Sequence, residues 1–360
     1  MTKDPVRRFG HGSPVLRLLR TRCMKALVTG STGFVGANLC AALVEQSWSV
    51  RALHRPSSRL DALREAGVAV EQAIGDVTEP GTLTEAIRDC DVVFHVAAVA
   101  DYWRQSTDKL YRANVDGTRA VCQAALDAGV HRLVFTSSVA SLGIPDPSQG
   151  LMDESHPFNL PPERFRYGHS KLLAEGVVRE FVARGLDAVI VNPSVILGPG
   201  DLNLISGSIV TQIASGHVPP VYPPGGVHYI DVADVCAGHI AAAERGRAGE
   251  RYILAAHNLS HREAMHTVCE VVGVPGPHFE LPRALIGPLA AMIDLATRIA
   301  RRPLPLNGDQ LRLAGEFIYF DSSKAARELG LPQTPFRETV KRTYHWYKAH
   351  GYLGRKTNNP

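Results

Sequence analysis

Short apolar segments alternate with amphipathic segments through the first half of the chain, and this alternation restricts the fold more than any other feature. The apolar segments are rich in Val, Ile, Leu or Phe and end at turn residues, as buried parallel strands do. The predicted strands are Lys25–Thr29, Val50–His54, Ala69–Ile74, Val92–Val96, Arg132–Thr136 and Ala188–Val191. The predicted helices between them are Val35–Gln46, Arg59–Ala66, Thr82–Arg88, Asp108–Ala128 and Phe165–Arg184. Parallel strands joined by helices need right-handed crossovers, so the pattern predicts an α/β fold with a doubly wound parallel sheet.

The pattern changes after about residue 200, which suggests a second structural unit. Pro and Gly become frequent there, and helical segments dominate from Ser260 to a last predicted helix at Lys341–Ala349. We expect residues 24–200 to form the sheet domain, with the chain returning to the sheet at about 227–256. The remaining segments, 201–226 and 257–353, should form a smaller, mainly helical lobe. In open α/β folds such a lobe covers the carboxyl ends of the strands, where ligands bind.

Two helix starts carry the spacing of a capping box, in which a Ser or Thr and a Glu three residues later satisfy each other's backbone N–H groups. They are Thr82-x-x-Glu85 and Ser260-x-x-Glu263. Residues 1–23 are different, because they contain five arginines against one acid and no long apolar stretch. We expect this basic N-terminal extension to be disordered rather than a secretory signal.

Composition excludes several functional classes. The net charge of +4 over 360 residues is too small to predict nucleic-acid binding. The six cysteines show no metal-ligand spacing, and we expect free thiols in a reducing, cytoplasmic protein. His257 and His261 are separated by one helical turn but lack a third ligand, so no metal site is predicted. His95, at the end of a predicted strand, is expected to be a hydrogen-bonded core histidine.

No integral membrane segment is expected, since no apolar run reaches the roughly 18–20 residues that span a bilayer. The longest candidate, Ala284–Ala300, is interrupted by Pro288, Asp294 and Arg298 and is followed by a pair of arginines. Two interpretations remain open for it. It either packs against its own lobe, which we favour, or lies on a membrane surface.

Gly30, Gly33 and Gly36 follow the first predicted strand and open the first helix. The first glycine allows a tight turn, the second lets the backbone approach a pyrophosphate, and the third permits close packing of helix on strand. The helix N-terminus then offers N–H donors to phosphate. A glycine triplet is a weak signal alone, but between a strand and a helix it predicts a dinucleotide site.

Tyr167 and Lys171 are one helical turn apart, so their side chains lie on the same face of a predicted helix. A tyrosine with a pKa near 10 is a poor acid–base catalyst at neutral pH, and a nearby ammonium group favours its phenolate form. The strand that ends in Thr136-Ser137-Ser138 precedes this pair in the sequence. Together these residues predict chemistry on a carbon–oxygen bond.

The glycine spacing, the hydroxyl-rich strand end and the Tyr-x-x-x-Lys pair occur here in the order of the extended short-chain dehydrogenase/reductase superfamily, which this chain resembles from Met24 to about Leu353. The resemblance implies a Rossmann-type sheet and a catalytic triad of Ser138, Tyr167 and Lys171. It also implies a supporting role for Asn114, which would organise the lysine and a water through its backbone. Two long helices, Asp108–Ala128 and Phe165–Arg184, correspond to those that pair relatives into homodimers.

The same resemblance implies the residues that contact a nicotinamide dinucleotide. They are Gly30, Thr32, Gly33, Phe34, Val35, Gly36, His54, Arg55, Asp76, Val77, Ala97, Ala98, Thr136, Tyr167, Lys171, Pro193, Ser194 and Val195. No acidic residue ends the second strand, where one would bind the ribose hydroxyls of NAD. Arg55 stands there instead and can bind a 2′-phosphate, so NADP(H) is favoured over NAD(H).

The substrate class depends on segments in which members of the superfamily differ. Leu142-Gly143 and the segment from Val191 to Pro199 are similar to the dihydroflavonol 4-reductase and 3β-hydroxysteroid dehydrogenase branch, and also to hopanoid-associated sugar epimerases. Besides Ser138, the candidate substrate contacts are Tyr102, Trp103, His228 and Tyr229. We therefore predict an NADP(H)-dependent oxidoreductase for a bulky, largely apolar carbonyl or hydroxyl compound. The alternatives are a nucleotide-sugar epimerase or dehydratase and a catalytically silent dinucleotide-binding protein.

Overall fold

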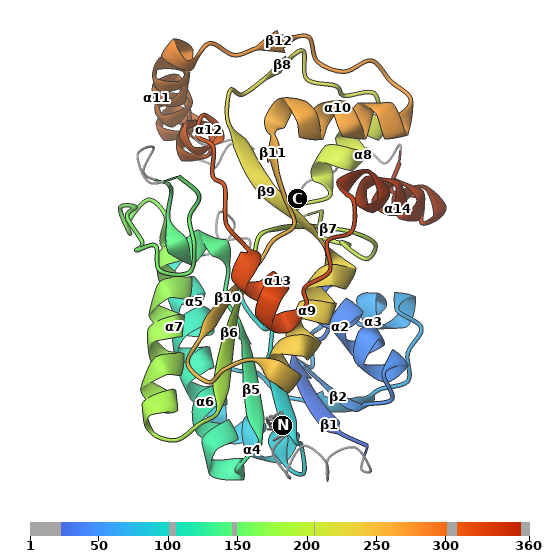
Figure 1. The fold of residues 1–360 in the computed structure, drawn as a ribbon, viewed down its shortest axis with the longest axis vertical. Helices are drawn as coiled ribbons and strands as arrows, with labels where there is room; N and C mark the ends of the chain where they lie inside the picture. Colours follow the sequence, from blue (N-terminus) through green and yellow to red (C-terminus); the bar gives the residue numbers. More distant parts are fainter. Residues whose placement is uncertain (1–22, 101–105, 146–149, 205, 301–307, 354–360) are drawn as a thin grey trace, which may run out of the picture.

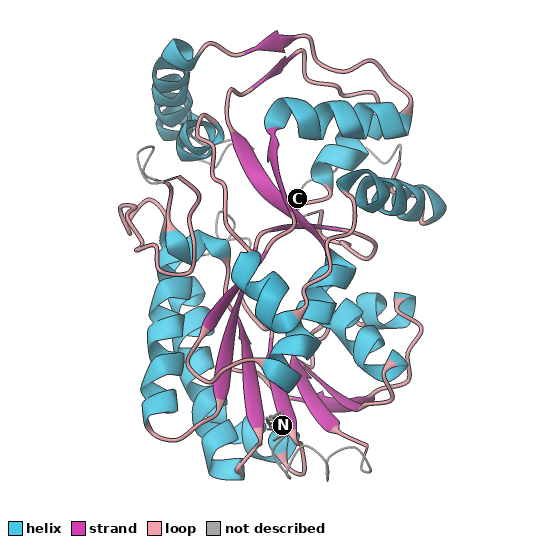
Figure 2. Ribbon diagram, viewed as in Figure 1, coloured by secondary structure: helices cyan, strands magenta, loops and turns pink. Residues whose placement is uncertain are grey.

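A computed structural model describes the chain over residues 23–100, 106–145, 150–204, 206–300 and 308–353. Its main feature is a seven-stranded sheet in the order β10-β6-β5-β4-β1-β2-β3 (Figures 1 and 2). All neighbouring strands in this sheet are parallel. The strands are β1 (Lys25–Thr29), β2 (Ser49–His54), β3 (Glu71–Ile74), β4 (Val92–His95), β5 (Arg132–Thr136), β6 (Ala188–Pro193) and β10 (Arg251–Leu254). The predicted Rossmann-type sheet is confirmed, since central strands such as β4 and β6 are apolar on both faces and buried throughout.

Helices cover both faces of the sheet. On one face α2 (Phe34–Glu45) and α9 (Val232–Arg245) pack together, and the short helices α3 (Asp61–Glu65) and α13 (Ser323–Leu329) lie beside them. On the other face α4 (Leu83–Ile87), α6 (Gly117–Ala128) and α7 (Arg166–Ala183) pack side by side. The large sheet therefore has two apolar cores, one under each helical layer.

The helix expected at Asp108–Ala128 contains an irregular turn. It consists of α5 (Thr107–Tyr111), a π-helical turn η3 (Arg112–Asp116) and α6. A π-helical turn inserts one extra residue into a helix and often marks a functional position. Here it carries Asn114.

The capping box at Ser260 is confirmed, because its hydroxyl accepts from the N–H of Glu263 while the Glu263 carboxylate accepts from the N–H of Ser260. The capping box at Thr82 is wrong. A 3-10 turn, η2 (Pro80–Thr82), runs directly into α4 and holds Thr82 in a helical conformation, whereas a cap needs an extended one. The Thr82 hydroxyl donates to the carbonyl oxygen of Glu79 at 2.8 Å instead.

The second half of the chain builds a lobe over the carboxyl ends of the strands (Figure 1). A three-stranded sheet joins β7 (Val195–Leu197), β9 (Gly226–Asp231) and β11 (His257–Ser260), and a smaller one joins β8 (Val221–Tyr222) to β12 (Phe279–Glu280). The lobe helices are α8 (Ser208–Ala214), α10 (His261–Val272), α11 (Arg283–Ala300), α12 (Gly308–Ala314) and α14 (Phe336–Ala349). Within the segment 227–256, α9 and β10 join the large sheet domain, whereas β9 belongs to the lobe.

Two glycines on α7 give a direct test of its packing. A Cβ atom on Gly168 would lie 2.3 Å from the carbonyl oxygen of Ala140, in the 3-10 turn η4 (Val139–Leu142), whereas a Cβ on Gly176 would have no neighbour within 4 Å. We expect Gly168→Ala to lower the free energy of unfolding by about 2 kcal/mol or more. Gly176→Ala should raise it by up to about 1 kcal/mol through helix propensity. Urea denaturation measures both, and equal effects of the two substitutions would contradict the close approach of α7 to η4.

Candidate active site

A cleft of about 1030 Å³ lies at the carboxyl ends of the large sheet and is lined by both the sheet domain and the lobe. Most of the predicted cofactor and catalytic residues line it. They are Gly30, Thr32, Gly33, Phe34, Val35, Gly36, His54, Arg55, Asp76, Val77, Ala97, Ala98, Thr136, Ser138, Tyr167, Lys171, Pro193 and Ser194. The large sheet brings these segments together because the carboxyl ends of parallel strands meet at one edge.

The glycine turn after β1 is shaped as a phosphate site requires. Gly30 has a φ of 68°, in the left-handed region, and its carbonyl oxygen accepts from the N–H of Gly33 at 3.0 Å. A Cβ on Gly36 would lie 2.1 Å from that same oxygen, so only glycine fits there. Gly33 is the N-cap of α2 and supplies no side-chain cap, which leaves N–H groups of the first turn available to an anion.

Two buried polar atoms in this cleft have no hydrogen-bond partner within the described protein. They are Nε2 of His54, at the end of β2, and Oγ of Ser194, just after β6. Buried polar groups are almost always hydrogen-bonded, so unpaired ones in a cleft indicate a polar ligand. Their positions at the two ends of the cleft fit a dinucleotide, with His54 on the adenosine side and Ser194 on the nicotinamide side. Arg55 is exposed at the rim beside His54.

Lys171 is buried and its Nζ donates to the carbonyl oxygen of Thr136 at 2.8 Å. Burial lowers the pKa of its ammonium group to about 7. Tyr167, one turn earlier on α7, is half-buried and lines the same cleft. The two side chains that the sequence paired therefore line the same cleft, with Lys171 held at the end of β5.

Of the three consecutive hydroxyls at the end of β5, two are committed to the protein interior. Ser137 donates to Oε1 of Glu175 at 2.6 Å. Thr136 Oγ1 bonds Nε2 of His239 at 2.8 Å. Ser138 is half-buried, and its Oγ accepts from the N–H of Ala140 at 3.2 Å, which leaves its own hydrogen for a ligand in the cleft.

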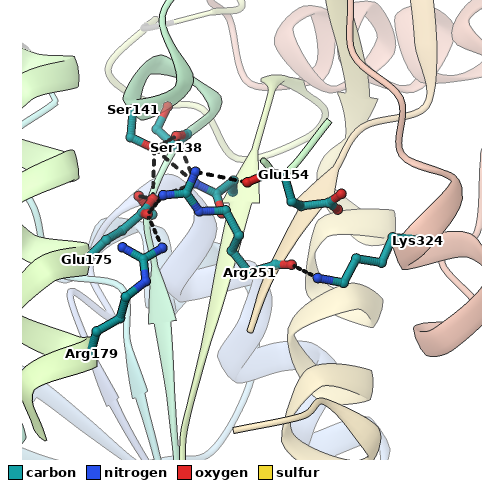
Figure 3. Close-up of polar contacts among 9 residues, drawn as sticks. Ser138, Ser141, Glu154, Glu175, Arg179, Arg251 and Lys324 are labelled. Atoms are coloured by element: carbon teal, nitrogen blue, oxygen red, sulfur yellow. Dashed lines mark hydrogen bonds and ion pairs between the residues drawn. The ribbon is translucent and has the colours of Figure 1, made fainter. Parts of the chain in front are cut away.

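Glu175 is a buried residue next to the site that the sequence reasoning missed. It is 0 % exposed, and Figure 3 shows its side chain extending from α7 toward the loop after β5 and toward Arg251 at the start of β10. Oε1 accepts from Ser137, from Ser141 at 2.7 Å and from Nδ2 of Asn192 at 2.7 Å. Arg179 and Arg251 pair with Oε2. The signal was present, because Glu175 falls between buried apolar residues on α7, where an unpaired charge would be very unfavourable.

Asn114 reaches the site through its side chain. It is buried, accepts from the N–H of Val99 at 2.8 Å and donates to Ser170 Oγ at 3.0 Å. Its backbone carbonyl accepts from Thr118 at 2.7 Å. The role that the resemblance implied, through the Asn114 backbone, stays a prediction. In this structure the Asn114 side chain links the segment after β4 to α7, where its partner Ser170 is adjacent to Lys171.

Of the predicted substrate contacts other than Ser138, none is found in the lining of the cleft among the described residues. Tyr102 and Trp103 lie outside the described residues. His228 and Tyr229 are buried in β9, the central strand of the lobe sheet, and do not line the cleft. His228 packs against Phe320, and Tyr229 against Phe336 on the other side of the strand. Both faces of β9 are thus covered in this structure, and contact of these two side chains with a substrate stays a prediction.

Val195 does not line the cleft either, since it pairs with Tyr229 in the lobe sheet and packs on the lobe core. Its neighbour Ile196 lines the cleft in its place. Other lining residues had no sequence signal. They include Lys109 on α5, Arg112 at the start of the π-helical turn η3, and Leu204 from the lobe.

The histidines set aside in the sequence are held by the protein. His95 is fully buried between Thr29 and Thr118, with its pKa lowered to about 3 by burial, and the expected core histidine is confirmed. Nε2 of His257 bonds the carbonyl oxygen of Thr334 at 2.9 Å. Across the described part of the chain, no group of His, Cys, Asp and Glu has the arrangement of a metal site.

The Glu175 contacts predict a difference between two glutamates of the same helix. Glu175→Gln should lower the free energy of unfolding by about 2 kcal/mol or more, because an amide leaves Arg251 unpaired and turns an N–H₂ group toward buried donors. Glu180→Gln is the control, since Glu180 is exposed and forms an ion pair with the equally exposed Arg119. Its substitution should change the free energy by less than about 0.5 kcal/mol in urea denaturation. Similar losses from both variants would contradict a central role for Glu175.

Comparison with known proteins agrees with this site. Residues 26–255 match the model of the NAD dependent epimerase/dehydratase family. A putative dihydroflavonol 4-reductase of a Synechocystis species is 37% identical over 335 residues, covering 91% of this chain and 95% of the relative. Sterol demethylase protein B of Methylococcus capsulatus is 33% identical, covering 92% and 100%. A ketoreductase of Stigmatella aurantiaca, named for a farnesyl-substituted dihydroquinoline oxide, is 33% identical, covering 85% and 91%.

Solved structures show the same fold over the whole length. The crystal structure of gox2253 superposes with a TM-score of 0.80 at 33% identity, covering 91% of this chain and 99% of that one. DesIV, a dTDP-glucose 4,6-dehydratase of Streptomyces venezuelae described with NAD bound, superposes with a TM-score of 0.73 at 25% identity, covering 92% and 99%. Family, fold and cleft agree. The chain belongs to the NAD-dependent epimerase/dehydratase family and is an NAD(P)-dependent enzyme of the short-chain oxidoreductase and epimerase type.

Proposed function

We propose that this protein is an NADP(H)-dependent reductase that transfers a hydride to a ketone or aldehyde carbon of a bulky, largely apolar substrate. The observation that carries the proposal is that Tyr167, Lys171 and Ser138 line the same cleft, and that the Ser138 hydroxyl donates to no group among the described residues. An acid, a cation and a hydrogen-bond donor at the end of one strand suit a reaction in which negative charge develops on a carbonyl oxygen.

Each residue has one task in this proposal. Ser138 donates a hydrogen bond to the substrate oxygen, and Tyr167 donates the proton that the oxygen needs once the carbonyl is reduced. Lys171 stabilises the resulting phenolate and binds the cofactor ribose. The nicotinamide, when bound, supplies the hydride. In the reverse direction Tyr167 takes up the proton from a hydroxyl group.

The preference for NADP(H) rests on the end of β2. His54 and Arg55 line the cleft there, and Leu53 and Ser58 complete that part of the lining without an acidic side chain. A carboxylate at this position would repel a 2′-phosphate, whereas a guanidinium binds it through two parallel hydrogen bonds. NAD(H) remains the alternative cofactor for this site.

The substrate class rests on relatives and on the cleft. The names of three relatives mention a dihydroflavonol, a sterol and a farnesyl-substituted dihydroquinoline oxide. Each of these compounds has a bulky, largely apolar framework that bears an oxygen function. The lining that extends beyond the catalytic residues includes Ala100, Ile196 and Leu204, which suit an apolar ring system. A nucleotide-sugar epimerase or dehydratase is the competing function, and a silent dinucleotide-binding protein is the third.

One experiment distinguishes the reductase from the epimerase or dehydratase and from the silent binding protein. Purified protein is mixed with NADPH or NADH and a panel of flavanonols, ketosteroids, aromatic aldehydes and keto-sugars, and nicotinamide absorbance is followed. We expect net NADPH consumption with an apolar ketone. Tyr167→Phe should reduce turnover by about 10²–10⁴-fold while NADPH binding is kept, because only the proton donor is lost. Epimerised nucleotide sugar without net consumption, or full activity in the Tyr167→Phe variant, would contradict the proposal.

The cofactor preference is tested on two neighbouring arginines. Arg55→Ala should raise the Kd of NADPH by about 10–100-fold, since a charge-assisted contact to phosphate is lost, and should leave the Kd of NADH unchanged. Arg59→Ala is the matched control, because Arg59 is exposed and pairs with Asp61 at 2.7 Å. Fluorescence titration with each nucleotide gives both constants. Equal weakening of NADPH and NADH by Arg55→Ala would show that Arg55 does not select the phosphate.

A further inference from the structure

Helix α11 is apolar on the side that packs and also on the side that faces solvent. Its inner side, Ile286 and Ala290, is buried against Leu311 of α12. Its outer side carries a row of large exposed apolar side chains at helical spacing: Leu285, Met292, Leu295 and Ile299. Met292 is 62% exposed and Ile299 74% exposed. Large apolar side chains exposed along the solvent side of a helix, where polar residues are the rule, indicate an interaction surface.

Charged side chains on α11 are distributed unevenly around this row. Arg283 and Arg298 are exposed near the two ends of the helix. The one acidic residue of α11, Asp294, is turned toward α12, where it pairs with Arg312 at 2.9 Å. An apolar row flanked by arginines and free of acids fits the boundary between acyl chains and anionic headgroups.

The size of the face argues against a second copy of the chain as its occupant. A helix of this length is about 27 Å long and about 10 Å wide, so its outer face offers about 270 Å². A stable protein–protein interface needs about 800 Å² from each partner. A bilayer has no such requirement, because it covers an apolar helix face without shape complementarity. Among the described helices none is long and apolar enough to cross a membrane, so contact would be with the surface only.

We propose that α11 docks this protein on the surface of an anionic lipid bilayer, with Leu285, Met292, Leu295 and Ile299 inserted among the acyl chains. The packing interpretation favoured from the sequence accounts for the inner face of the helix, and the membrane-surface interpretation accounts for the outer face. α11 lies at the edge of the lobe in Figure 1, where no other labelled element covers its outer side.

The docked orientation would bring the active site close to the lipid. Arg312 pairs with Asp309 at 2.9 Å, and Asp309 pairs with Arg164, which lies in the segment just before α7. The α11–α12 unit is thereby fixed to the start of the helix that carries Tyr167. An apolar substrate dissolved in the bilayer would need only a short path to the cleft, a consequence that rests on the proposed function, whereas the docking itself does not.

Vesicle flotation of the full chain tests the docking. Vesicles are made of phosphatidylcholine alone or of phosphatidylcholine with phosphatidylglycerol. We expect the protein to float with the anionic vesicles, and Ile299→Asp to lower the bound fraction by about tenfold, because a charge replaces an inserted side chain. Ile74→Asp is the matched control, since Ile74 is an exposed isoleucine, 65% accessible, on β3 at the edge of the large sheet, and this variant should float like the unsubstituted protein. Arg298→Gln should weaken binding to anionic vesicles only.

The outcomes that overturn the proposal are equally direct. Protein that stays unbound at every lipid concentration, or an Ile299→Asp variant that floats like the unsubstituted chain, would each do so. A dimer that Ile299→Asp converts to a monomer in light scattering, without vesicle binding, would assign the face to self-association and also overturn it. Turnover of a water-soluble ketone in lipid-free buffer depends on the catalytic cleft and not on α11, so a failure of docking is distinguishable from a failure of the proposed reaction.

Discussion

The arrangement of the catalytic side chains depends on one buried carboxylate. Glu175 joins the loop after β5, through Ser137 and Ser141, to the end of β6, through Asn192, and to the start of β10, through Arg251. Burying a charge is costly unless every part of it is paired, and here both carboxylate oxygens are. The Glu175 carboxylate accepts hydrogen bonds from Ser137 and Ser141, which lie on either side of Ser138 in the sequence. The loop that carries Ser138 therefore cannot shift without breaking several buried hydrogen bonds at once.

Helix α7 connects Glu175 to the catalytic side chains, because residues four positions apart on a helix lie on the same side. Tyr167, Lys171 and Glu175 follow one another at intervals of one turn, and therefore lie along one side of the helix. Tyr167 reaches the cleft, Lys171 reaches the end of β5, and Glu175 reaches the loop beyond it. The close approach of Gly168 to Ala140 fixes how deeply the helix sits. A single helix thus sets the separation between the proton donor, the cation and the hydroxyl.

The sequence was most informative where one local rule decides the structure. The buried strands, the glycine turn and the Tyr167–Lys171 spacing each follow from periodicity or backbone sterics, and the structure has them where they were predicted. The sequence was less informative where distant segments decide. Thr82 fits a capping box by spacing, but the preceding 3-10 turn fixes its backbone. His228 and Tyr229 were placed at the cleft by resemblance, whereas strand pairing in the lobe buries them.

The contrast between Glu175 and α11 shows why burial has to be known before polarity or apolarity can be interpreted. In the sequence, Glu175 is one of two acids on its predicted helix, and the apolar segment that forms α11 fits either a packed helix or a helix on a membrane surface. In the structure the acid is fully buried, and several large apolar side chains of α11 are exposed. Each of these features is unfavourable in isolation, so each requires a compensating partner. Glu175 has its partners within the chain, which makes it structural, whereas the outer face of α11 has none among the described residues, and for this reason we propose a lipid surface as its partner.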